Sequence, residues 1–339
     1  MPDKAASSVG VIGGGSWGTT LADLLADKGH KVALWVFEKD LAEEMKANRE
    51  NKTYLPGVKL HSQLDVTCRI EEAARDKEYL VMAAPSHVFR RVVEQVIPLL
   101  SPETIITTVS KGIENETLLT MTEILEELLP ETRHDDIVVL SGPSFAREVS
   151  QKTPTAVTCA SKKEATAERV QYLFATSYFR VYRSTDCIGA ELGGALKNVI
   201  AIAAGIADGL GFGTNTRAAL ITRGLAEISR LGMKLGAQPL TFAGLAGMGD
   251  LVLTCTGDLS RNRTVGLKLG QGLKLAEILE GMKMVAEGVK TTRSAYFLSR
   301  KADVEMPIIE QVYEVLYEKK EPIEAVKELM GRDLKEEWE

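Results

Sequence analysis

A glycine-rich turn near the N-terminus is the feature that most restricts how this chain can fold. Residues 8–13 form a short apolar run that leads into Gly13, Gly15 and Gly18, spaced as G-x-G-x-x-G before a helical pattern. The first glycine of such a turn permits a sharp bend, the second lets the backbone approach a pyrophosphate, and the third lets the helix pack on the strand. The N–H groups of the helix N-terminus then face the anion. The motif therefore predicts a dinucleotide-binding β-α-β unit.

The chain up to about residue 183 alternates between short β-branched runs and longer helical patterns. This alternation is typical of a parallel sheet with crossover helices, and runs that are apolar on both faces fit a sheet covered on both sides. The predicted strands are 8–13, 31–36, 79–84, 104–109, 137–141, 156–160 and 179–182. The predicted helices are 17–28, 41–48, 88–97, 118–129 and 163–174, with apolar residues at spacings of three and four.

The strand pattern stops after Cys187, and residues 189–207 are mostly Ala, Gly, Leu and Ile. This composition predicts a buried helix at the centre of an all-helical second domain. Further predicted helices are 216–231, 263–269, 275–280, 291–300, 308–317 and 321–330. The fold class is therefore predicted as α/β, with an N-terminal Rossmann-type doubly wound sheet over residues 1–187. An all-α C-terminal domain over residues 188–339 is predicted to bind substrate and carry the catalytic groups.

Composition excludes several classes of protein. With 47 acidic and 41 basic residues among 339, the net charge of −6 provides no cationic field for nucleic acid. The four cysteines include no close pair, and no two histidines have metal-ligand spacing, so we expect neither a disulfide framework nor a metal. The N-terminus lacks a signal peptide's apolar stretch, and no run approaches the ~20 apolar residues that span a bilayer. We predict a soluble, cytoplasmic protein.

The end of the second predicted strand bears on cofactor preference. Glu38 lies 20 residues beyond Gly18, where an acidic side chain binds the ribose hydroxyls of the adenosine half. This placement favours NAD over NADP. The alternative is that Glu38 only begins the next helix as a solvated acid, and the neighbouring Lys39 could meet a 2′-phosphate. The sequence therefore leaves the preference between NAD and NADP open.

Polar residues follow three predicted strands at their carboxyl ends, the edge where open α/β sheets bind ligands. His87 follows one strand, Lys111 follows the next, and the segment 141–148 follows a third. We expect Lys111 to project a cation at this edge and the segment 141–148 to cover the nicotinamide side of the site. The alternatives are a first-turn helical histidine, a solvated loop lysine and a plain turn.

Lys197 is the only cation in the apolar run 188–207. A lysine whose pKa is brought toward ~7–8 by burial or a second cation suits general acid/base catalysis. Asp250, an acid between glycines and apolar residues, is its predicted partner, because Glu191 is six residues from Lys197 and off its helical face. A buried ion pair without catalysis, and helix capping by Asp250, are the competing interpretations.

A cluster of hydrogen-bond donors precedes the predicted helix 263–269. Ser260, Arg261, Asn262 and Arg263 combine a hydroxyl, an amide and guanidinium groups in one turn at a helix N-terminus. This combination suits a phosphate group. A solvated basic turn is the alternative.

These motifs together resemble the bacterial NAD(P)-dependent glycerol-3-phosphate dehydrogenases from about residue 9 to residue 331. The matching segments are GGGSWGT at 13–19, PSHVF at 85–89, SKGIE at 110–114, SGPSFAREV at 141–149, ELGGALKNVIAIAAG at 191–205, GMGDLVLTCTGDLSRNR at 247–263, VAEGV at 285–289 and MPI at 306–308. The resemblance implies a Rossmann domain, a helical domain, a cleft between them, and NAD(P)-dependent interconversion of dihydroxyacetone phosphate and sn-glycerol 3-phosphate for phospholipid synthesis.

The resemblance also implies residue roles. Lys197 corresponds to the proton donor and acceptor, with Lys111 adding positive charge and Asp250 holding Lys197. The implied substrate contacts are Lys111, Gly142, Ser144, Lys197, Asp250, Ser260, Arg261 and Asn262. The implied cofactor contacts are Ser16, Trp17, Lys111, Ala146, Arg261, Val285 and Glu287, beside Gly13, Gly15, Gly18 and Glu38 of the turn and second strand. Many members carry a basic residue or His where this chain has Phe37, which weakens the case for NADP.

Two other functions stay open from the sequence. One is a related two-domain dehydrogenase acting on a β-hydroxy acid or ketopantoate, which would not need the donor cluster 260–263 in that form. The other is a non-catalytic NAD-sensing module, which would have no reason to bury Lys197 beside Asp250. We expect a small-molecule substrate, and a homodimer is one candidate assembly.

Overall fold

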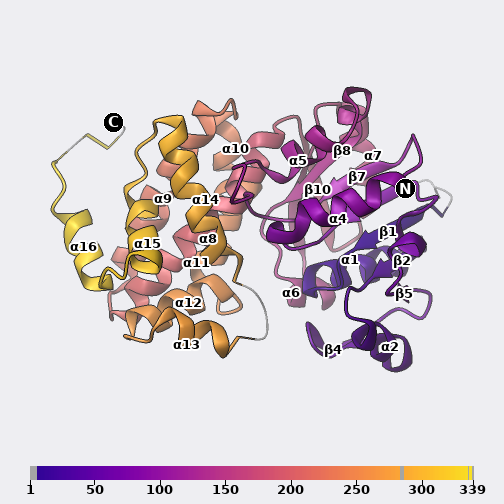
Figure 1. Cartoon of the computed structure of the whole chain (residues 1–339), viewed down its shortest axis with the longest axis horizontal. Coiled ribbons are helices and arrows are strands. Elements are labelled where there is room, and N and C mark those ends of the chain that lie inside the picture. The colour runs from indigo at the N-terminus through magenta and orange to yellow at the C-terminus, as the bar shows by residue number, and fades with distance from the viewer. Residues whose placement is uncertain (1–5, 283–285, 335, 338–339) are drawn as a thin grey trace.

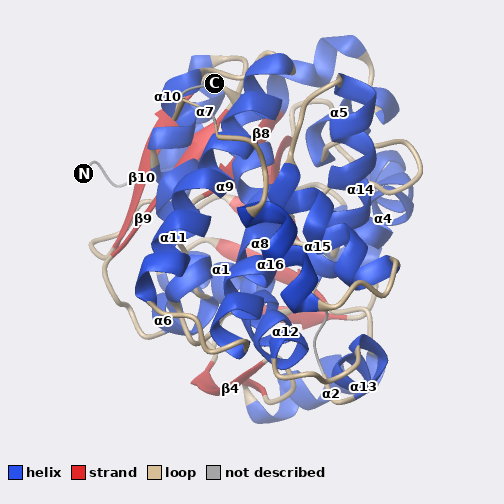
Figure 2. Ribbon diagram, turned by 90° about the vertical axis from the view of Figure 1, so that its left-hand side faces the viewer, coloured by secondary structure: helices blue, strands red, loops and turns tan. Residues whose placement is uncertain are grey.

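The computed structural model describes residues 6–282, 286–334 and 336–337. Figure 1 shows two lobes, a sheet with its helices built from the N-terminal half and a bundle of helices built from the C-terminal half. Seen from the side of the helical lobe, the strands lie behind the helices (Figure 2). This arrangement confirms the predicted fold class.

The described part of the chain forms an eight-stranded sheet in the order β10-β9-β8-β7-β6-β1-β2-β5. Strand β1 pairs with β2 on one side and with β6 on the other. The chain therefore extends the sheet from β1 first in one direction and then in the other. The glycine turn therefore follows a strand at the point where the strand order reverses, which is where doubly wound sheets bind ligands. The strands are β1 (Ser8–Ile12), β2 (Lys31–Trp35), β5 (Asp65–Thr67), β6 (Tyr79–Met82), β7 (Ile105–Thr108), β8 (Ile137–Ser141), β9 (Thr155–Ala160) and β10 (Phe179–Ser184).

Helices cover both faces of this sheet. Val9 and Val11 of β1 face one apolar cluster, whereas Ile12 faces another, as alternation along a strand requires. The first cluster includes residues of α1 (Ser16–Asp27), α2 (Lys39–Asn48) and α7 (Glu164–Phe174). The second includes residues of α3 (Ile70–Ala74), α4 (Phe89–Val96) and α5 (Met121–Leu128). Strands buried on both faces explain why their sequences are apolar throughout.

The prediction that the whole sheet is parallel is wrong at one edge. Strand β9 pairs with β8 antiparallel, and β10 pairs with β9 parallel. The helix between β8 and β9 is α6 (Ala146–Ser150), and its five residues span only about 7.5 Å at 1.5 Å per residue. It is too short to return the chain along a strand, whereas the longer α7 makes the crossover between β9 and β10.

Several short elements were not predicted. They are the hairpin of β3 (Glu50–Asn51) and β4 (Leu55–Lys59), strand β5, and helices α3, α10 (Pro239–Ala243) and α11 (Asp250–Thr256). Each has seven residues or fewer, so its sequence is too short to show a periodic pattern.

The helical lobe is built around α8 (Cys187–Gly209). Twenty of its 23 residues are buried, and other helices surround it. In the described part of the chain, α8 alone is long and apolar enough to cross a membrane, but 94% of its most apolar window is buried inside the protein. These are the surroundings of a core helix. The other helices are α9 (Thr214–Lys234), α12 (Arg261–Gly270), α13 (Leu275–Glu280), α14 (Glu287–Ala302), α15 (Pro307–Tyr317) and α16 (Pro322–Met330).

The predicted domain division at residues 187 and 188 falls in the first turn of α8, just after the connection 185–186. The two lobes contact each other along α8 and α5. Glu191 of α8 accepts hydrogen bonds from the backbone N–H of Thr122, at 2.9 Å, and from its hydroxyl. Burial raises the pKa of Glu191 to about 7, against the effect of these hydrogen bonds. Glu191 therefore joins the lobes and is not the partner of Lys197.

Helices α8 and α12 approach so closely that glycines line both sides of their contact. A Cβ atom on Gly266 would lie 2.0 Å from the carbonyl oxygen of Ile202, and one on Gly205 would lie 2.1 Å from that of Arg263. Both distances are far below van der Waals contact, so no side chain fits. This contact fixes the start of α12 relative to Lys197.

We predict that Gly266→Ala destabilises the protein by about 1–3 kcal/mol, the usual cost of overpacking, and lowers the melting temperature. The matched control is Gly281→Ala, where a Cβ would have no neighbour closer than 3.7 Å. Thermal unfolding followed by circular dichroism measures both variants. Equal melting temperatures for the two would contradict the close approach of α8 and α12.

Candidate active site

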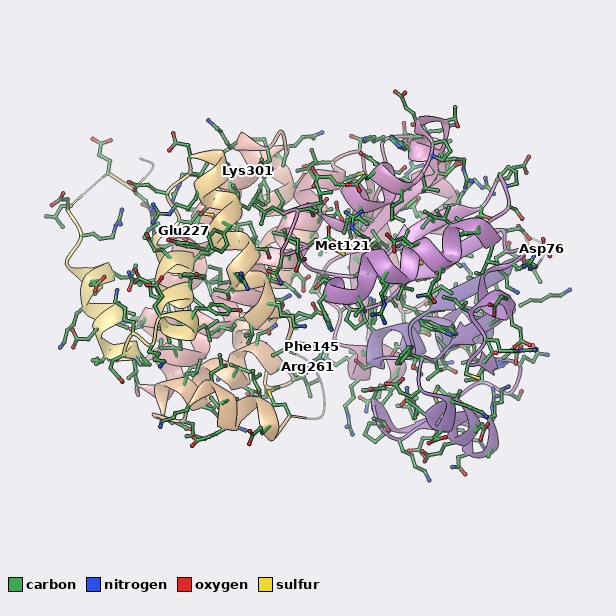
Figure 3. All side chains as sticks on the ribbon, viewed as in Figure 1. Asp76, Met121, Phe145, Glu227, Arg261 and Lys301 are labelled. Carbon is green, nitrogen blue, oxygen red and sulfur yellow. The ribbon has the colours of Figure 1, made fainter. Side chains whose placement is uncertain are left out.

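A cleft of about 780 Å³ lies between the two lobes. Its walls include the glycine turn after β1, the ends of β6 and β7, the start of α6, and the turn before α12. Phe145 of the sheet lobe and Arg261 of the helical lobe both line this cleft, and Figure 3 shows them where the two lobes meet. The ring of Phe145 also closes on the turn before α12, because a Cβ on Gly257 would lie 2.5 Å from it.

The glycine turn has the form that a dinucleotide requires. Gly13 has φ +127°, and a Cβ there would lie 2.6 Å from the carbonyl oxygen of Ala83. A Cβ on Gly18 would lie 2.0 Å from the carbonyl oxygen of Gly13, so the helix packs directly on the turn. A Cβ on Gly15 would meet nothing within 4 Å, and Gly15 precedes the first residue of α1. Gly15 therefore leaves open space for a pyrophosphate at the N-terminus of α1.

The other expected cofactor residues of this lobe also line the cleft. They are Ser16 and Trp17, which begin α1, and Ala146, which begins α6. The carbonyl oxygen of Ala146 accepts a 3.3 Å hydrogen bond from Thr20, and the Trp17 ring packs at 6.4 Å from the ring of Phe179. The hydrogen bond holds α6 against α1 beside the glycine turn, and the ring contact packs the start of α1 on β10.

The residues after β2 form the far end of the cleft. Glu38 lines it and accepts a 2.9 Å hydrogen bond from the hydroxyl of Tyr54. Its side chain makes no capping bond to α2, although its backbone occupies the N-cap position. Phe37 is 71% exposed and also lines the cleft, whereas Lys39 is paired with Glu43 at 3.8 Å. Thus Glu38, and not Lys39, is among the residues described as lining the cleft.

Lys197, Asp250 and Lys111 form one group at the cleft. Lys197 and Lys111 line the cleft, and Asp250 lies buried behind them. The carboxylate of Asp250 accepts hydrogen bonds from Lys197 Nζ through one oxygen and from Lys111 Nζ, at 2.6 Å, through the other. Lys197 is 7% exposed and Asp250 is 0% exposed. The predicted contact between Lys197 and Asp250 is therefore confirmed. The competing interpretation, helix capping by Asp250, does not hold, because Gly249 is the N-cap of α11 and Asp250 is its first residue. Because Asp250 is covered, it acts through the two lysines.

Three elements bring this group together. Lys197 comes from the middle of α8, Asp250 begins α11, and Lys111 comes from the loop after β7. The stem of Lys111 crosses α8 at Gly194, where a Cβ would lie 3.5 Å from its Cδ. Lys111 Nζ also donates a 3.1 Å hydrogen bond to the carbonyl oxygen of Gly142, a residue with φ +137° after β8.

Burial lowers the pKa of Lys197 to about 8, although the attraction of Asp250 opposes the shift. The cation of Lys111 adds to the lowering. An amine with such a pKa exchanges its proton near neutral pH, as a general acid or base must. This is the environment predicted for Lys197 from its place in an apolar helix.

The N-cap and first residues of α12 contribute three of the four predicted donors to the cleft. Ser260, Arg261 and Asn262 line it, whereas Arg263 points away and pairs with Asp208 at 2.8 Å and with Asp258. Including Arg263 in the cluster was therefore wrong. The Ser260 hydroxyl also accepts a 3.3 Å hydrogen bond from the backbone N–H of Arg263, as an N-cap.

Burial lowers the pKa of the Arg261 guanidinium, and the nearby carboxylate of Glu287 opposes this shift. Asn262 is held by two hydrogen bonds. Its amide donates to Asn198 at 2.9 Å, and its oxygen accepts from the backbone N–H of Gly288 at 2.9 Å. The turn is thus fixed against both α8 and α14.

Glu287 is the first residue of α14 and reaches across to the sheet lobe. Its carboxylate accepts a 2.6 Å hydrogen bond from the hydroxyl of Ser86, and burial raises its pKa. Val285 was also expected at the cofactor site, but it lies outside the described residues. His87, weighed as a catalytic group, is exposed and is not among the described residues that line the cleft.

Sequence reasoning did not single out Thr254, Asn198 or Tyr54. The hydroxyl of Thr254 accepts a 2.9 Å hydrogen bond from Lys197 Nζ and donates at 2.6 Å to the backbone oxygen of Asp250. Its spacing of four from Asp250 would have placed it on the same helical face, had α11 been predicted.

Within the described residues, no three His, Cys, Asp or Glu side chains are grouped to hold a metal ion.

Family models described as NAD-dependent glycerol-3-phosphate dehydrogenase N-terminus and C-terminus match residues 8–167 and 186–327. The chain belongs to the NAD-dependent glycerol-3-phosphate dehydrogenase family. Similar curated proteins named glycerol-3-phosphate dehydrogenase (NAD(P)+) include that of Citrifermentans bemidjiense, 62% identical over 332 residues, 98% of this chain and 99% of that one. That of Geobacter sulfurreducens is 62% identical over 331 residues, covering 97% of this chain and 99% of the relative.

Solved structures agree with this membership. The glycerol-3-phosphate dehydrogenase of Coxiella burnetii superposes with a TM-score of 0.92 at 39% identity, over 96% of this chain and 99% of that one. A ketopantoate reductase structure from Ralstonia eutropha matches with a TM-score of 0.60 at 12% identity. At this identity, the similarity to the ketopantoate reductase shows only that the two proteins share a fold. The family predicted from the sequence motifs is thereby confirmed.

We predict that Asp250→Asn destabilises the protein by up to about 3–5 kcal/mol at pH 7, because it leaves the buried ammonium group of Lys197 and the partly buried one of Lys111 without their carboxylate. Asp258→Asn is the matched control, since the Asp258 side chain is 98% exposed. Denaturant unfolding of both variants measures the difference. An Asp250→Asn protein as stable as the control would contradict the burial of the three charges.

Proposed function

We propose that the chain reduces dihydroxyacetone phosphate to sn-glycerol 3-phosphate with NADH or NADPH, reversibly, and so supplies glycerophospholipid synthesis. The observation that carries this proposal is the group of Lys197, Asp250 and Lys111 at the bottom of one cleft. The same cleft contains a dinucleotide turn on one wall and the donors Ser260, Arg261 and Asn262 on the other. A proton donor, a cofactor site and an anion site thus face a common space.

The bound cofactor supplies a hydride from its nicotinamide ring. Gly13, Gly15 and Gly18 shape the pyrophosphate site, while Ser16, Trp17 and Ala146 form its neighbouring wall. Glu38 accepts hydrogen bonds from the ribose hydroxyls of the adenosine half, and its negative charge disfavours binding of a 2′-phosphate. We assign Arg261, Glu287 and Lys111 to the nicotinamide half.

Lys197 is the proposed general acid. As the carbonyl carbon of the substrate receives the hydride, its oxygen takes a proton from Lys197 Nζ, which leaves the lysine neutral until solvent protonates it again. Lys111 stabilises the developing negative charge on that oxygen. Asp250 is a positioning residue that holds both ammonium groups. In the reverse direction, the neutral lysine accepts the proton of the C2 hydroxyl.

The substrate is held by both lobes. We assign the phosphate to Arg261 and Asn262, with the Ser260 hydroxyl at the helix N-terminus. Gly142 and Ser144 complete the substrate site, and Ser144 donates a 3.0 Å hydrogen bond to the carbonyl oxygen of Gly142. Phosphate binding away from the reacting carbon helps to orient the carbonyl.

The deciding experiment follows NADH and NADPH absorbance after addition of dihydroxyacetone phosphate, with unphosphorylated dihydroxyacetone and ketopantoate as controls. We expect oxidation with the phosphate ester alone, and faster oxidation of NADH if Glu38 and Phe37 determine the preference. Cofactor binding without turnover would favour the sensing module, and turnover of ketopantoate would favour the other dehydrogenase class. A soluble state in the cytoplasm and a homodimer stay predictions.

We predict that Lys197→Ala lowers kcat by about 10²–10⁴, the range for loss of one general acid, while the cofactor still binds. In the wild type, kcat for reduction should fall as the pH rises through about 8, because Lys197 then loses its proton. The rate of oxidation should rise over the same range. Steady-state kinetics from pH 6 to 10 test this, and unchanged turnover in the variant would refute the assignment.

We predict that Arg261→Ala raises the KM for dihydroxyacetone phosphate strongly, since loss of a buried charge contact costs roughly 2–5 kcal/mol. Arg263→Ala is the control, because Arg263 pairs with Asp208 outside the cleft. Initial rates against substrate concentration measure both. An equal effect of the two substitutions would count against a phosphate site at Arg261.

A further inference from the structure

The loop 109–120 joins β7 to α5 and carries Lys111 near its start. It passes between the lobes, so it has neighbours on both sides. On the helical side, Ile113 is 3% exposed within the core of the helical lobe, and its carbonyl oxygen accepts a 3.1 Å hydrogen bond from Ser294 of α14. Close to Lys111 the fit is tight, because a Cβ on Gly112 would lie 2.4 Å from that of Ser86.

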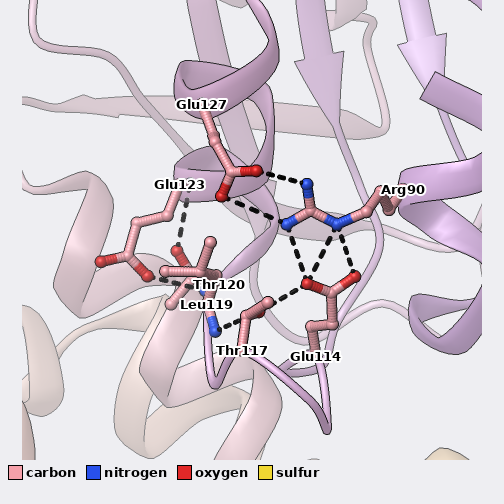
Figure 4. Close-up of polar contacts among 7 residues, drawn as sticks. All are labelled: Arg90, Glu114, Thr117, Leu119, Thr120, Glu123 and Glu127. Carbon is pink, nitrogen blue, oxygen red and sulfur yellow. Dashed lines mark hydrogen bonds and ion pairs between the residues drawn. The ribbon is translucent and has the colours of Figure 1, made fainter. Parts of the chain in front are cut away.

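On the sheet side, Arg90 of α4 holds Glu114 of this loop (Figure 4). Its Nε and Nη2 donate to the two carboxylate oxygens at 2.9 Å each, the paired geometry that a guanidinium makes with a carboxylate. Nη1 donates at 2.7 Å to Glu127 of α5. The side chains of Arg90 and Glu114 are 22% and 12% exposed, so this pair is shielded more than an ordinary surface ion pair.

Other bonds close the loop around Glu114. The backbone N–H of Glu114 donates to the oxygen of Leu119 at 2.9 Å, and Thr117 donates its hydroxyl to the Glu114 carboxylate. Partial burial would raise the pKa of Glu114, but the hydrogen bonds from Arg90 and Thr117 outweigh it and hold the pKa below its ordinary value. Glu114 is therefore ionised at neutral pH and lies three residues from Lys111.

We propose that Arg90 and Glu114 are positioning residues for Lys111: their paired contact fixes the loop so that Lys111 Nζ stays on Asp250 beside Lys197. The inference rests on the proposed roles of Lys111 and Lys197. The groups facing Lys197 are the ammonium of Lys111, the carboxylate of Asp250, the hydroxyl of Thr254 and the thiol of Cys255. Of these, only Lys111 depends on this loop for its position.

The consequence is measurable as a pH effect. Lys111 adds to the lowering of the pKa of Lys197, so a loop that lets Lys111 move away allows that pKa to rise. The fall of kcat for reduction at alkaline pH should then shift to higher pH. Substitution of a residue that served only the stability of the fold would lower the melting temperature and leave the alkaline fall of kcat at the same pH.

The test compares Arg90→Lys and Glu114→Gln with Lys111→Ala over the full pH profile of the intact enzyme. We expect both loop variants to lower kcat by about 10- to 100-fold, the scale of a small misplacement. The alkaline limb should shift upward in the same direction as in Lys111→Ala. Glu127→Gln is the matched control, since it removes the other partner of Arg90 and leaves the Arg90–Glu114 contact in place; it should behave as wild type.

The outcomes separate the two proposals. If Lys111→Ala shifts the alkaline limb and the loop variants do not, the inference about Arg90 and Glu114 is overturned and the proposed function stands. If Lys111→Ala leaves the limb in place, the proposed roles of Lys111 and Lys197 fail, and the inference fails with them. Melting temperatures of all variants show whether each protein is folded, and a lower melting temperature with a wild-type pH profile also overturns the inference.

Discussion

The carboxylate of Asp250 lies between two ammonium groups in a space that water barely reaches. Removing three charges from water costs several kcal/mol per ion, and the cost is recovered only if each charge keeps its partner in good geometry. The three residues come from α8, α11 and the loop after β7, so the lobes must be held in a fixed relation. The group also leaves one net positive charge at the bottom of the cleft, where a carbonyl oxygen gaining negative charge would be stabilised.

The fold could be predicted from the sequence wherever an element is a continuous apolar run or a long periodic helix. The strands of β1, β2 and β6 and the helix α8 carry their own pattern, because burial on both faces or all round demands apolar residues. The direction of β9 and β10 could not be predicted in this way, since alternation of strands and helices does not report the length of α6. The hairpin β3–β4, strand β5 and helices α3, α10 and α11 have too few residues for a period to appear.

The residues of the site also divide into those that the sequence could predict and those that it could not. Lys197 could be found because a cation in an apolar helix needs a partner, and Asp250 because an acid among apolar residues needs one too. Arg263 was grouped with its neighbours by adjacency, but adjacent residues of a helix point in different directions, and the structure turns it toward Asp208. Thr254 was missed because α11 was not predicted, although its spacing of four from Asp250 fits one helical face. The contact between Ser86 and Glu287 depends on which elements meet, and spacing along the chain does not give this information.

The contacts between the lobes explain how Lys111 and Lys197, which come from different elements, are held close together. Glu191 binds the start of α5, Ser294 and the helical core hold Ile113, and Ser86 reaches Glu287. All three contacts lie in or beside the loop 109–120, so the segment that carries Lys111 is held by both lobes. A lysine on a freely moving loop would lose side-chain and backbone entropy each time it approached Asp250. Anchoring the loop on both lobes removes that cost before substrate arrives. The positive charge of Lys111 is then already in place when negative charge develops on the substrate.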